Sequence, residues 1–108
     1  MYLIVSKHLV AKHYMGFAFW PFVFIKNNGL RFNKIFLNHE KIHLRQQLEL
    51  LIIPFYICYI LEFLIRYLYC RNVSQAYLDI SFEKEAYSNE LNTDYLKTRK
   101  IWSFLKYL

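Results

Sequence analysis

Two histidines and a glutamate stand close together in the segment His39-Glu40-Lys41-Ile42-His43, which has the pattern HExxH. On a helix, residues four apart lie on one face about one turn from each other, so both imidazoles can reach one metal ion. Zinc accepts imidazole nitrogens at tetrahedral angles and tolerates an open fourth position. Glu40 can take a proton from a zinc-bound water and later give it to the leaving amine. The segment therefore predicts His39 and His43 as zinc ligands and Glu40 as the general base.

A third ligand has to come from downstream of His43, where the sequence contains no further histidine. The two cysteines form no CxxC pair, so a carboxylate is the remaining donor. Glu83 and Glu85 both open a predicted helix, and only one can face the metal because they point about 200° apart. We favour Glu83, since the small Ala86 one turn later would let this helix approach the HExxH helix closely. Glu85 remains the alternative third ligand.

The pattern HExxH, followed some tens of residues later by an acidic residue in an ExxA(D/N) helix, resembles the gluzincin clan of metallopeptidases. The segments NHEKIHLRQQLE and FEKEAY carry this resemblance, which covers residues 17–90. The chain is most similar to the minimal soluble minigluzincins and to uncharacterised small bacterial HExxHxxQ proteins. It also resembles the catalytic cores of the membrane-embedded CAAX prenyl proteases and the antirepressor-sensor peptidases. The resemblance implies a zinc-dependent peptidase in which Glu83 is the third ligand.

The same resemblance implies how the site is supported and where substrate lies. The clan places Asp or Asn four positions after the glutamate ligand, where it hydrogen-bonds a histidine ligand; that position is Tyr87 in this chain, a departure. An edge strand above the active-site helix binds extended substrate by backbone pairing. Residues 17–26 suit that role, because Pro21 cannot donate to a β-ladder and marks a sheet edge or a bulge.

Further polar residues are candidates for roles around the site. Gln46 and Gln47 follow His43 by about one turn, so one of them shares its face and is expected to hydrogen-bond a ligand or line the cleft. Surface solvation is the alternative for both. The oxyanion stabiliser in this class is usually a Tyr, His or Arg. The candidates are Tyr77, Tyr87, Tyr95 and Arg99.

The elements that position these residues are predicted to form an α+β fold, a mostly helical minimal zincin-like domain with a small N-terminal β element. Residues 17–26 have the aromatic and β-branched composition of a strand. Asn33 predicts the N-cap of a helix from residue 34 to about 51 that carries HExxH. Pro54 ends this helix or lies in the first turn of the next. The remaining expectations are a helix over 55–70, a polar connection over 72–81, a helix over 82–97 capped by Ser81, and a short docked helix over 101–108.

Length and charge limit the classes of protein and partner. A chain of 108 residues supports a single domain, residues 1–108. Its net charge of +6 forms no basic stripe within a nucleic-acid motif, so we expect no nucleic-acid partner. A solvated basic face or weak attraction to anionic lipid accounts for this charge. Cys58 and Cys70 are expected to be buried free thiols in a reducing compartment, and residues 1–10 lack a secretory pattern, which favours a cytoplasmic location.

The apolar segment 48–70 raises the question of a membrane. Its apolar run from Leu50 to Leu61 is interrupted by Pro54 and followed by Glu62 and Arg66. A spanning helix needs about 20 predominantly apolar residues. We therefore expect a buried core helix, with an interfacial or membrane-embedded segment as the alternative, and peripheral membrane contact stays open.

Two functions of different kind follow from these observations. In the first, the protein is a zinc metallopeptidase that hydrolyses a peptide or protein substrate with Glu40 as general base. In the second, it is a catalytically inactive or latent zinc-binding domain that acts as a protein- or membrane-interaction module. In a latent form, residues 101–108 are the segment that would cover the zinc.

Overall fold

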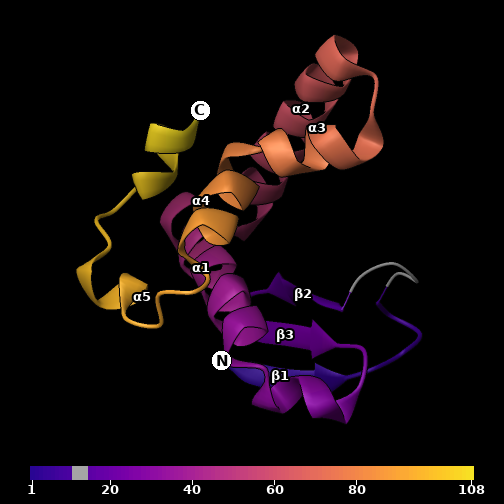
Figure 1. Cartoon of the computed structure of the whole chain (residues 1–108), viewed down its shortest axis with the longest axis vertical. Coiled ribbons are helices and arrows are strands. Elements are labelled where there is room, and N and C mark those ends of the chain that lie inside the picture. The colour runs from indigo at the N-terminus through magenta and orange to yellow at the C-terminus, as the bar shows by residue number, and fades with distance from the viewer. Residues whose placement is uncertain (11–14) are drawn as a thin grey trace.

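A small sheet and a run of helices make up the chain in the computed structural model, which describes residues 1–10 and 15–108 (Figure 1). The strands β1 (Tyr2–Val5), β2 (Gly16–Phe19) and β3 (Phe22–Ile25) form a sheet in the order β1-β3-β2, with β1 parallel and β2 antiparallel to β3. The helical elements are η1 (Asn28–Phe32), α1 (Lys34–Leu50), α2 (Ile52–Cys70), α3 (Val73–Asp79), α4 (Ser81–Asn89), α5 (Tyr95–Thr98) and η2 (Ser103–Tyr107). The α+β class, mostly helical with a small N-terminal sheet, is confirmed.

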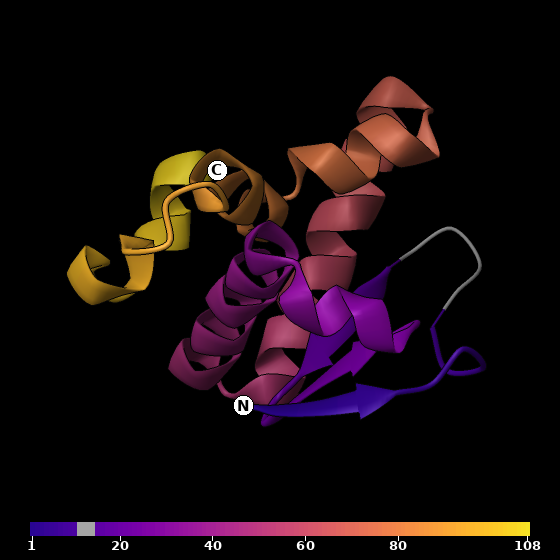
Figure 2. The same ribbon diagram turned by 60° about the horizontal axis from the view of Figure 1, so that its bottom comes forward.

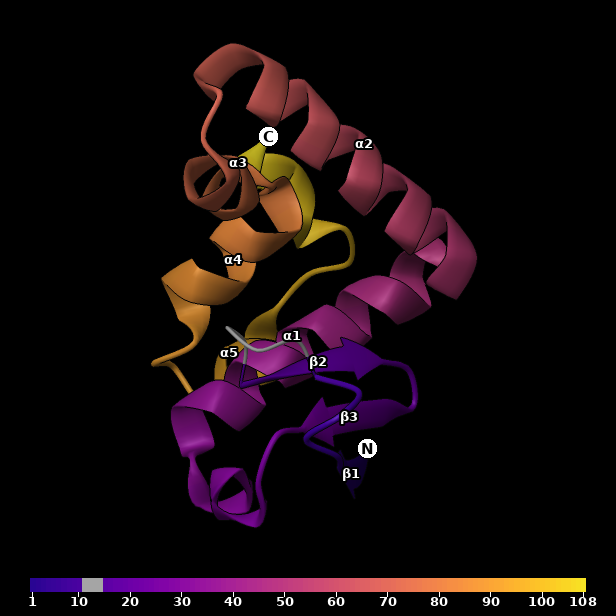
Figure 3. The same ribbon diagram turned by 90° about the vertical axis from the view of Figure 1, so that its right-hand side faces the viewer.

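The helix α1 is the central element, since it contacts β2, α2 and α4 (Figures 2 and 3). It begins where predicted, because the Asn33 side chain accepts a hydrogen bond from the Phe36 backbone N–H at 3.0 Å. Phe36 and Leu44 are buried with Ala18, Val23 and Ile25 of the sheet. A second buried face of α1 carries the HExxH residues, so the helix is held between the sheet and the rest of the domain.

The N-terminal β element is larger than predicted. The expected single strand over 17–26 is instead a hairpin, with Trp20 and Pro21 in the turn between β2 and β3 and a cis peptide bond between them. A turn suits Pro21 because it has no N–H to give to a β-ladder. The strand β1 was not predicted from its short apolar segment. The free edge of the sheet beside α1 belongs to β2.

The middle of the chain departs from the prediction at its connections. Pro54 lies in the first turn of α2, as predicted. Residues 72–81, expected to be a polar connection, contain α3, which begins where the Asn72 side chain accepts from the Gln75 N–H at 2.9 Å. An Asn cap in a polar segment was therefore the missed signal.

The helix α4 is shorter than predicted and begins differently. It ends at Asn89, and a separate α5 follows, so a continuous helix over 82–97 was wrong. Ser81 does not cap it, because the Ser81 hydroxyl donates to Glu62 at 2.6 Å and its N–H donates to the same carboxylate at 3.0 Å. This pair of hydrogen bonds ties the start of α4 to the middle of α2.

The helix α2 is not the buried core helix that we expected. Phe55 is its one buried residue, and most of its aliphatic side chains are exposed. Cys58 and Cys70 are exposed as well, so their predicted burial was wrong. In length and composition α2 is apolar enough to cross a membrane, the one helix of the described residues for which this holds.

The C-terminal tail docks on the domain as predicted, as the 3-10 helix η2. Phe104 is buried and stacks near Phe82 of α4, with ring centroids 4.7 Å apart and planes at 41°. Phe82 in turn packs on Phe55 of α2 at 4.7 Å. With Ile80, these three rings form the second apolar cluster of the domain and join the tail to α2 and α4.

Gly16 occupies a position on β2 with no room for a side chain. A Cβ there would lie 2.2 Å from the Phe24 carbonyl oxygen and 2.8 Å from the Phe36 ring. We predict that Gly16→Ala lowers the free energy of unfolding by about 2 kcal/mol, because a paired strand and a buried ring cannot both move away without strain. Urea unfolding followed by far-ultraviolet circular dichroism measures this value. Gly29→Ala is the matched control, since its Cβ would meet only the Asn27 side chain at 3.2 Å; equal losses in both variants would contradict the prediction.

Candidate metal centre

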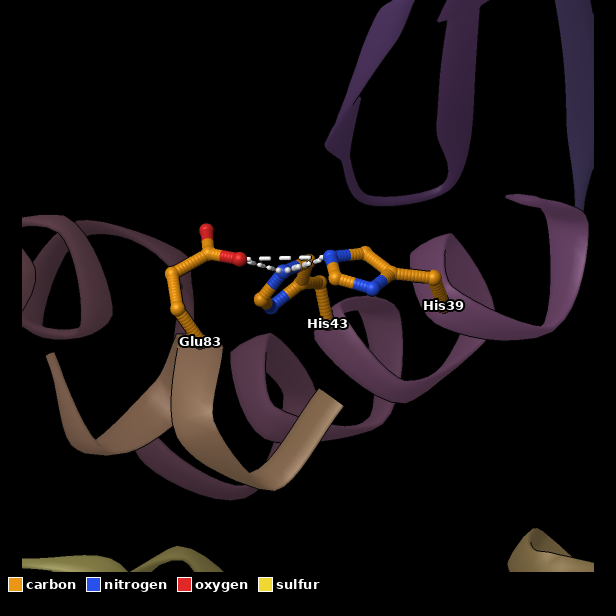
Figure 4. Close-up of side chains that lie close together, drawn as sticks. All are labelled: His39, His43 and Glu83. Carbon is orange, nitrogen blue, oxygen red and sulfur yellow. Dashed lines mark hydrogen bonds and ion pairs between the residues drawn. The ribbon is translucent and has the colours of Figure 1, made fainter. Parts of the chain in front are cut away.

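Three side chains converge on one buried point between α1 and α4 (Figure 4). His39 Nε2 and His43 Nε2 lie 3.1 Å apart, and Glu83 Oε1 lies 3.2 Å from the first and 3.1 Å from the second. The three donor atoms thus form a nearly equilateral triangle. Ligands bound to tetrahedral zinc at about 2.0–2.1 Å would be about 3.3 Å apart, so the spacing fits zinc. All three residues are buried.

Gln46 determines which nitrogen of His43 carries a hydrogen. Its Nε2 donates to the Phe82 carbonyl oxygen at 3.1 Å and to Glu85 at 2.9 Å, which orients the amide. Its Oε1 therefore faces His43 Nδ1, at 2.8 Å. Because an amide oxygen only accepts, Nδ1 of His43 is the donor, and in the neutral ring the Nε2 lone pair points at the triangle. Of the two expectations for Gln46, a hydrogen bond to a predicted ligand is the one found.

Glu90 determines which nitrogen of His39 carries a hydrogen. Its carboxylate Oε2 lies 2.8 Å from His39 Nδ1, so this ring also presents Nε2 to the triangle. The resemblance placed such a partner at Tyr87, but the Tyr87 ring instead packs against the His39 ring, with centroids 4.4 Å apart. Glu90 lies seven positions after Glu83, about two helical turns along the same face, and that spacing was the missed signal.

The donor set is therefore three electron pairs that point at one another. Two imidazole nitrogens and a carboxylate oxygen cannot share this space without a proton or a cation between them. Two imidazoles and a carboxylate with an open fourth position are also the ligands that a catalytic zinc takes in other proteins. The residues present fit zinc on both counts.

The electrostatics of the triangle favour a positive charge. Burial would lower the pKa of His43, but the Glu83 carboxylate, together with Glu40 and the hydrogen bond to Gln46, outweighs it and raises that pKa to about 9. In the opposite direction, burial would raise the pKa of Glu83, but His43 and its hydrogen bonds hold it well below the usual range. Tyr59 also donates to Glu83 Oε2 at 2.5 Å, so the carboxylate stays ionised and oriented.

Glu85, the rival ligand, points away from the triangle. Its carboxylate is buried and accepts from Arg99 Nε at 2.5 Å and from the Tyr95 hydroxyl at 2.6 Å. Arg99 also donates to Glu49 through both of its Nη atoms, at 2.5 and 3.0 Å. Glu85 therefore joins α4, α1 and the C-terminal segment, and Tyr95 and Arg99 are engaged there rather than at the triangle.

Two cavities meet Glu40, with volumes of about 510 and 260 Å³. Glu40, Gly16 and Tyr77 line both of them. The larger cavity also reaches His43 and Glu83, and the smaller one reaches His39. Residues 101–108 line neither cavity, so the tail that we expected to cover a latent site lies elsewhere in this structure.

The larger cavity is mostly apolar. Aromatic side chains from β2 and α2 supply much of its wall, namely Phe17, Phe55, Tyr56, Tyr59 and Phe63. Glu40 lies in this wall with only 6% of its surface exposed. Burial raises the pKa of Glu40, although His43 and His39 oppose the shift. Burial and the nearby Glu83 carboxylate likewise raise the pKa of the Tyr77 phenol, so it stays protonated near neutral pH.

The edge of β2 faces the cavities. The Lys26 N–H donates to the Met15 carbonyl at 2.9 Å, and in an antiparallel pair this fixes the alternation of the following residues. Gly16 and Ala18 therefore turn their backbone N–H and C=O groups away from β3. The Ala18 carbonyl accepts from Gln47 Nε2 at 2.9 Å and from the Tyr56 hydroxyl. Gln47 thus lines the cleft, as one of the two expectations had it.

Comparison of the chain with known proteins gives no relative. No protein-family model, no curated protein and no solved structure matches it. What the protein does is therefore inferred from the geometry of its own residues.

Zinc affinity distinguishes Glu83 from Glu85 as the third ligand. We predict that Glu83→Ala weakens zinc binding by more than the roughly 100-fold that loss of an outer partner costs, because a direct ligand is removed. Glu85→Ala should lower stability, since it leaves Arg99 buried with one partner fewer, yet its folded fraction should keep one zinc per chain. Titration against a chromophoric chelator gives both affinities. Equal affinity in wild type and Glu83→Ala would refute the assignment.

Glu90 offers a second measurement on the same site. We predict that Glu90→Gln weakens zinc binding by roughly 10- to 100-fold, because a neutral amide orients the His39 ring less firmly than a carboxylate. Asp94→Asn is the control, since the Asp94 side chain is 71% exposed and forms its ion pair with Lys97 on the surface. If the two variants bind zinc alike, the hydrogen bond from His39 to Glu90 has no part in metal binding.

Proposed function

We propose that the protein is a zinc-dependent peptidase with His39, His43 and Glu83 as the metal ligands and Glu40 as the general base. The observation that supports this most is the buried triangle of electron pairs, with Glu40 beside it in the wall of two open cavities. When bound, zinc supplies Lewis acidity, which activates water and polarises a carbonyl group. The remaining chemistry belongs to residues of the chain.

Glu40 is suited to move a proton. Burial raises the pKa of its carboxyl group above the ordinary value, and a raised pKa makes a carboxylate a stronger base. Positive charge on His43 and His39 limits this rise, because both residues lower the pKa of Glu40. Glu40 can thus accept a proton from water and return it to the leaving amine.

Tyr77 is the best placed of the four oxyanion candidates. It lines both cavities together with Glu40, whereas Tyr95 and Arg99 bind Glu85. Its raised pKa keeps the phenol protonated, so its O–H remains a donor. A donor of this kind stabilises negative charge that develops on a carbonyl oxygen. Tyr87, whose hydroxyl lies 3.3 Å from that of Tyr77, supports its position.

An extended peptide fits the surface around these groups. The outward backbone groups of Gly16 can pair with a peptide added as a further strand at the edge of β2. The large apolar cavity beside this edge suits a large apolar side chain of the peptide. We therefore propose as substrate an extended peptide or protein segment with an apolar residue near the bond that is cleaved. The alternative is an inactive zinc-binding domain.

Activity assays with a quenched fluorescent peptide library test the proposal. We predict that Glu40→Gln lowers kcat by roughly 10²–10⁴-fold with one zinc per chain retained, because it removes the base and leaves the ligands. Tyr77→Phe should lower kcat by roughly 10²-fold with zinc binding also unchanged, since it removes one donor. Asp94→Asn serves as the control. Full activity in Glu40→Gln would rule out its role, and a wild type that binds zinc without cleaving any peptide would favour the inactive domain.

A further inference from the structure

A strip of exposed aliphatic side chains runs along α2. Seven Ile and Leu residues form it, each between 49% and 64% exposed: Ile53, Ile57, Ile60, Leu61, Leu64, Ile65 and Leu68. At about 100° per residue they cover an arc of roughly 140°, and they follow one another over more than four turns. No charged side chain falls within this arc.

The opposite side of α2 packs against the rest of the domain. Phe55 and Phe63 pack in the cluster that includes Phe82 of α4, and Glu62 accepts both hydrogen bonds from Ser81. The helix α3 also contacts α2, and Figure 3 shows α3 and α4 on one side of it. The seven side chains of the strip remain exposed. A long apolar face held in water is costly, and on folded proteins such faces mark a site of interaction.

We propose that this strip binds the surface of an anionic lipid bilayer, with α2 lying in the boundary between headgroups and acyl chains. Helices that lie in a membrane interface bury an apolar face between the headgroups and the acyl chains, and the strip offers such a face. The net charge of +6 adds attraction to anionic headgroups, and Arg71 is exposed at the end of the helix. This inference does not depend on the proposed peptidase activity.

A bilayer matches the strip better than a second copy of the chain does. Two crossed helices contact each other over only part of their length, whereas a flat lipid surface can cover all the turns of the strip. The seven side chains also offer no hydrogen-bonding group, while protein interfaces carry about one hydrogen bond per 100–200 Å². A spanning arrangement would carry α3, α4 and the Glu62 carboxylate into the hydrocarbon, so an interfacial position is favoured.

Binding would also orient the larger cavity. Ile60 belongs to the strip and lines that cavity as well. A protein docked through the strip therefore holds the Ile60 wall of the cavity beside the lipid surface.

Cosedimentation of the purified protein with vesicles of phosphatidylcholine and phosphatidylglycerol tests the proposal. We expect wild type to bind these vesicles, and to bind pure phosphatidylcholine vesicles more weakly. The triple variant Ile57→Gln, Leu61→Gln and Leu64→Gln should bind roughly tenfold or more weakly, because three half-exposed side chains lose their burial in lipid. The matched control is Ile35→Gln, Leu91→Gln and Ile101→Gln, which changes three exposed apolar residues outside α2 and should bind like wild type.

Circular dichroism and urea unfolding establish that both triple variants are folded. Three outcomes would overturn the proposal: equal vesicle binding by wild type and the α2 variant, a stable dimer that the α2 variant abolishes without any vesicle binding, or retention in carbonate-washed membranes of expressing cells, which indicates a spanning helix. Glu40→Gln should bind vesicles like wild type, so loss of peptidase activity and loss of lipid binding are scored separately.

Discussion

The convergence of three electron pairs at one buried point is the constraint around which the domain is arranged. His39 Nε2, His43 Nε2 and Glu83 Oε1 lie within 3.2 Å of one another, and like-signed groups so close in an apolar interior repel unless a positive charge lies between them. The hydrogens that could relieve the repulsion are directed outward, because Gln46 and Glu90 accept them at the Nδ1 atoms. The junction of α1 and α4 therefore needs a proton or a cation among these three atoms.

A continuous set of polar contacts runs from the triangle to Arg99. His43 binds Gln46, Gln46 binds Glu85, and Glu85 binds the buried guanidinium of Arg99. Removal of one partner from a buried ion pair costs more than the pair contributes, so each member constrains the next. This explains why a segment 16 positions beyond Glu83 bears on the site without touching it. Residues 99–108 hold α4 in place, through Arg99 and Phe104, and do not cover the cavities.

On the other side of the triangle the domain is apolar and open. The edge of β2 and the inner face of α2 border the larger cavity, while the outer face of α2 is an aliphatic strip. In a chain of 108 residues one helix thus serves both a cavity wall and an outer surface. A small domain buries a smaller share of its surface than a large one, so such double use of an element is expected.

Local signals in the sequence determined the helix that carries HExxH and its boundaries. Asn33 caps α1, Pro54 lies at the start of α2, and the HExxH spacing places both histidines on one face, because capping and helical periodicity act within one or two turns. Long-range packing decided the rest. Glu83 and Glu85 are equivalent in local terms, and only the way α4 packs on α1 turns Glu83 to the histidines and Glu85 to Arg99. The same holds for Glu90 in place of Tyr87, for the hairpin at Pro21 and for the exposure of α2, since each depends on which surfaces meet in the folded chain.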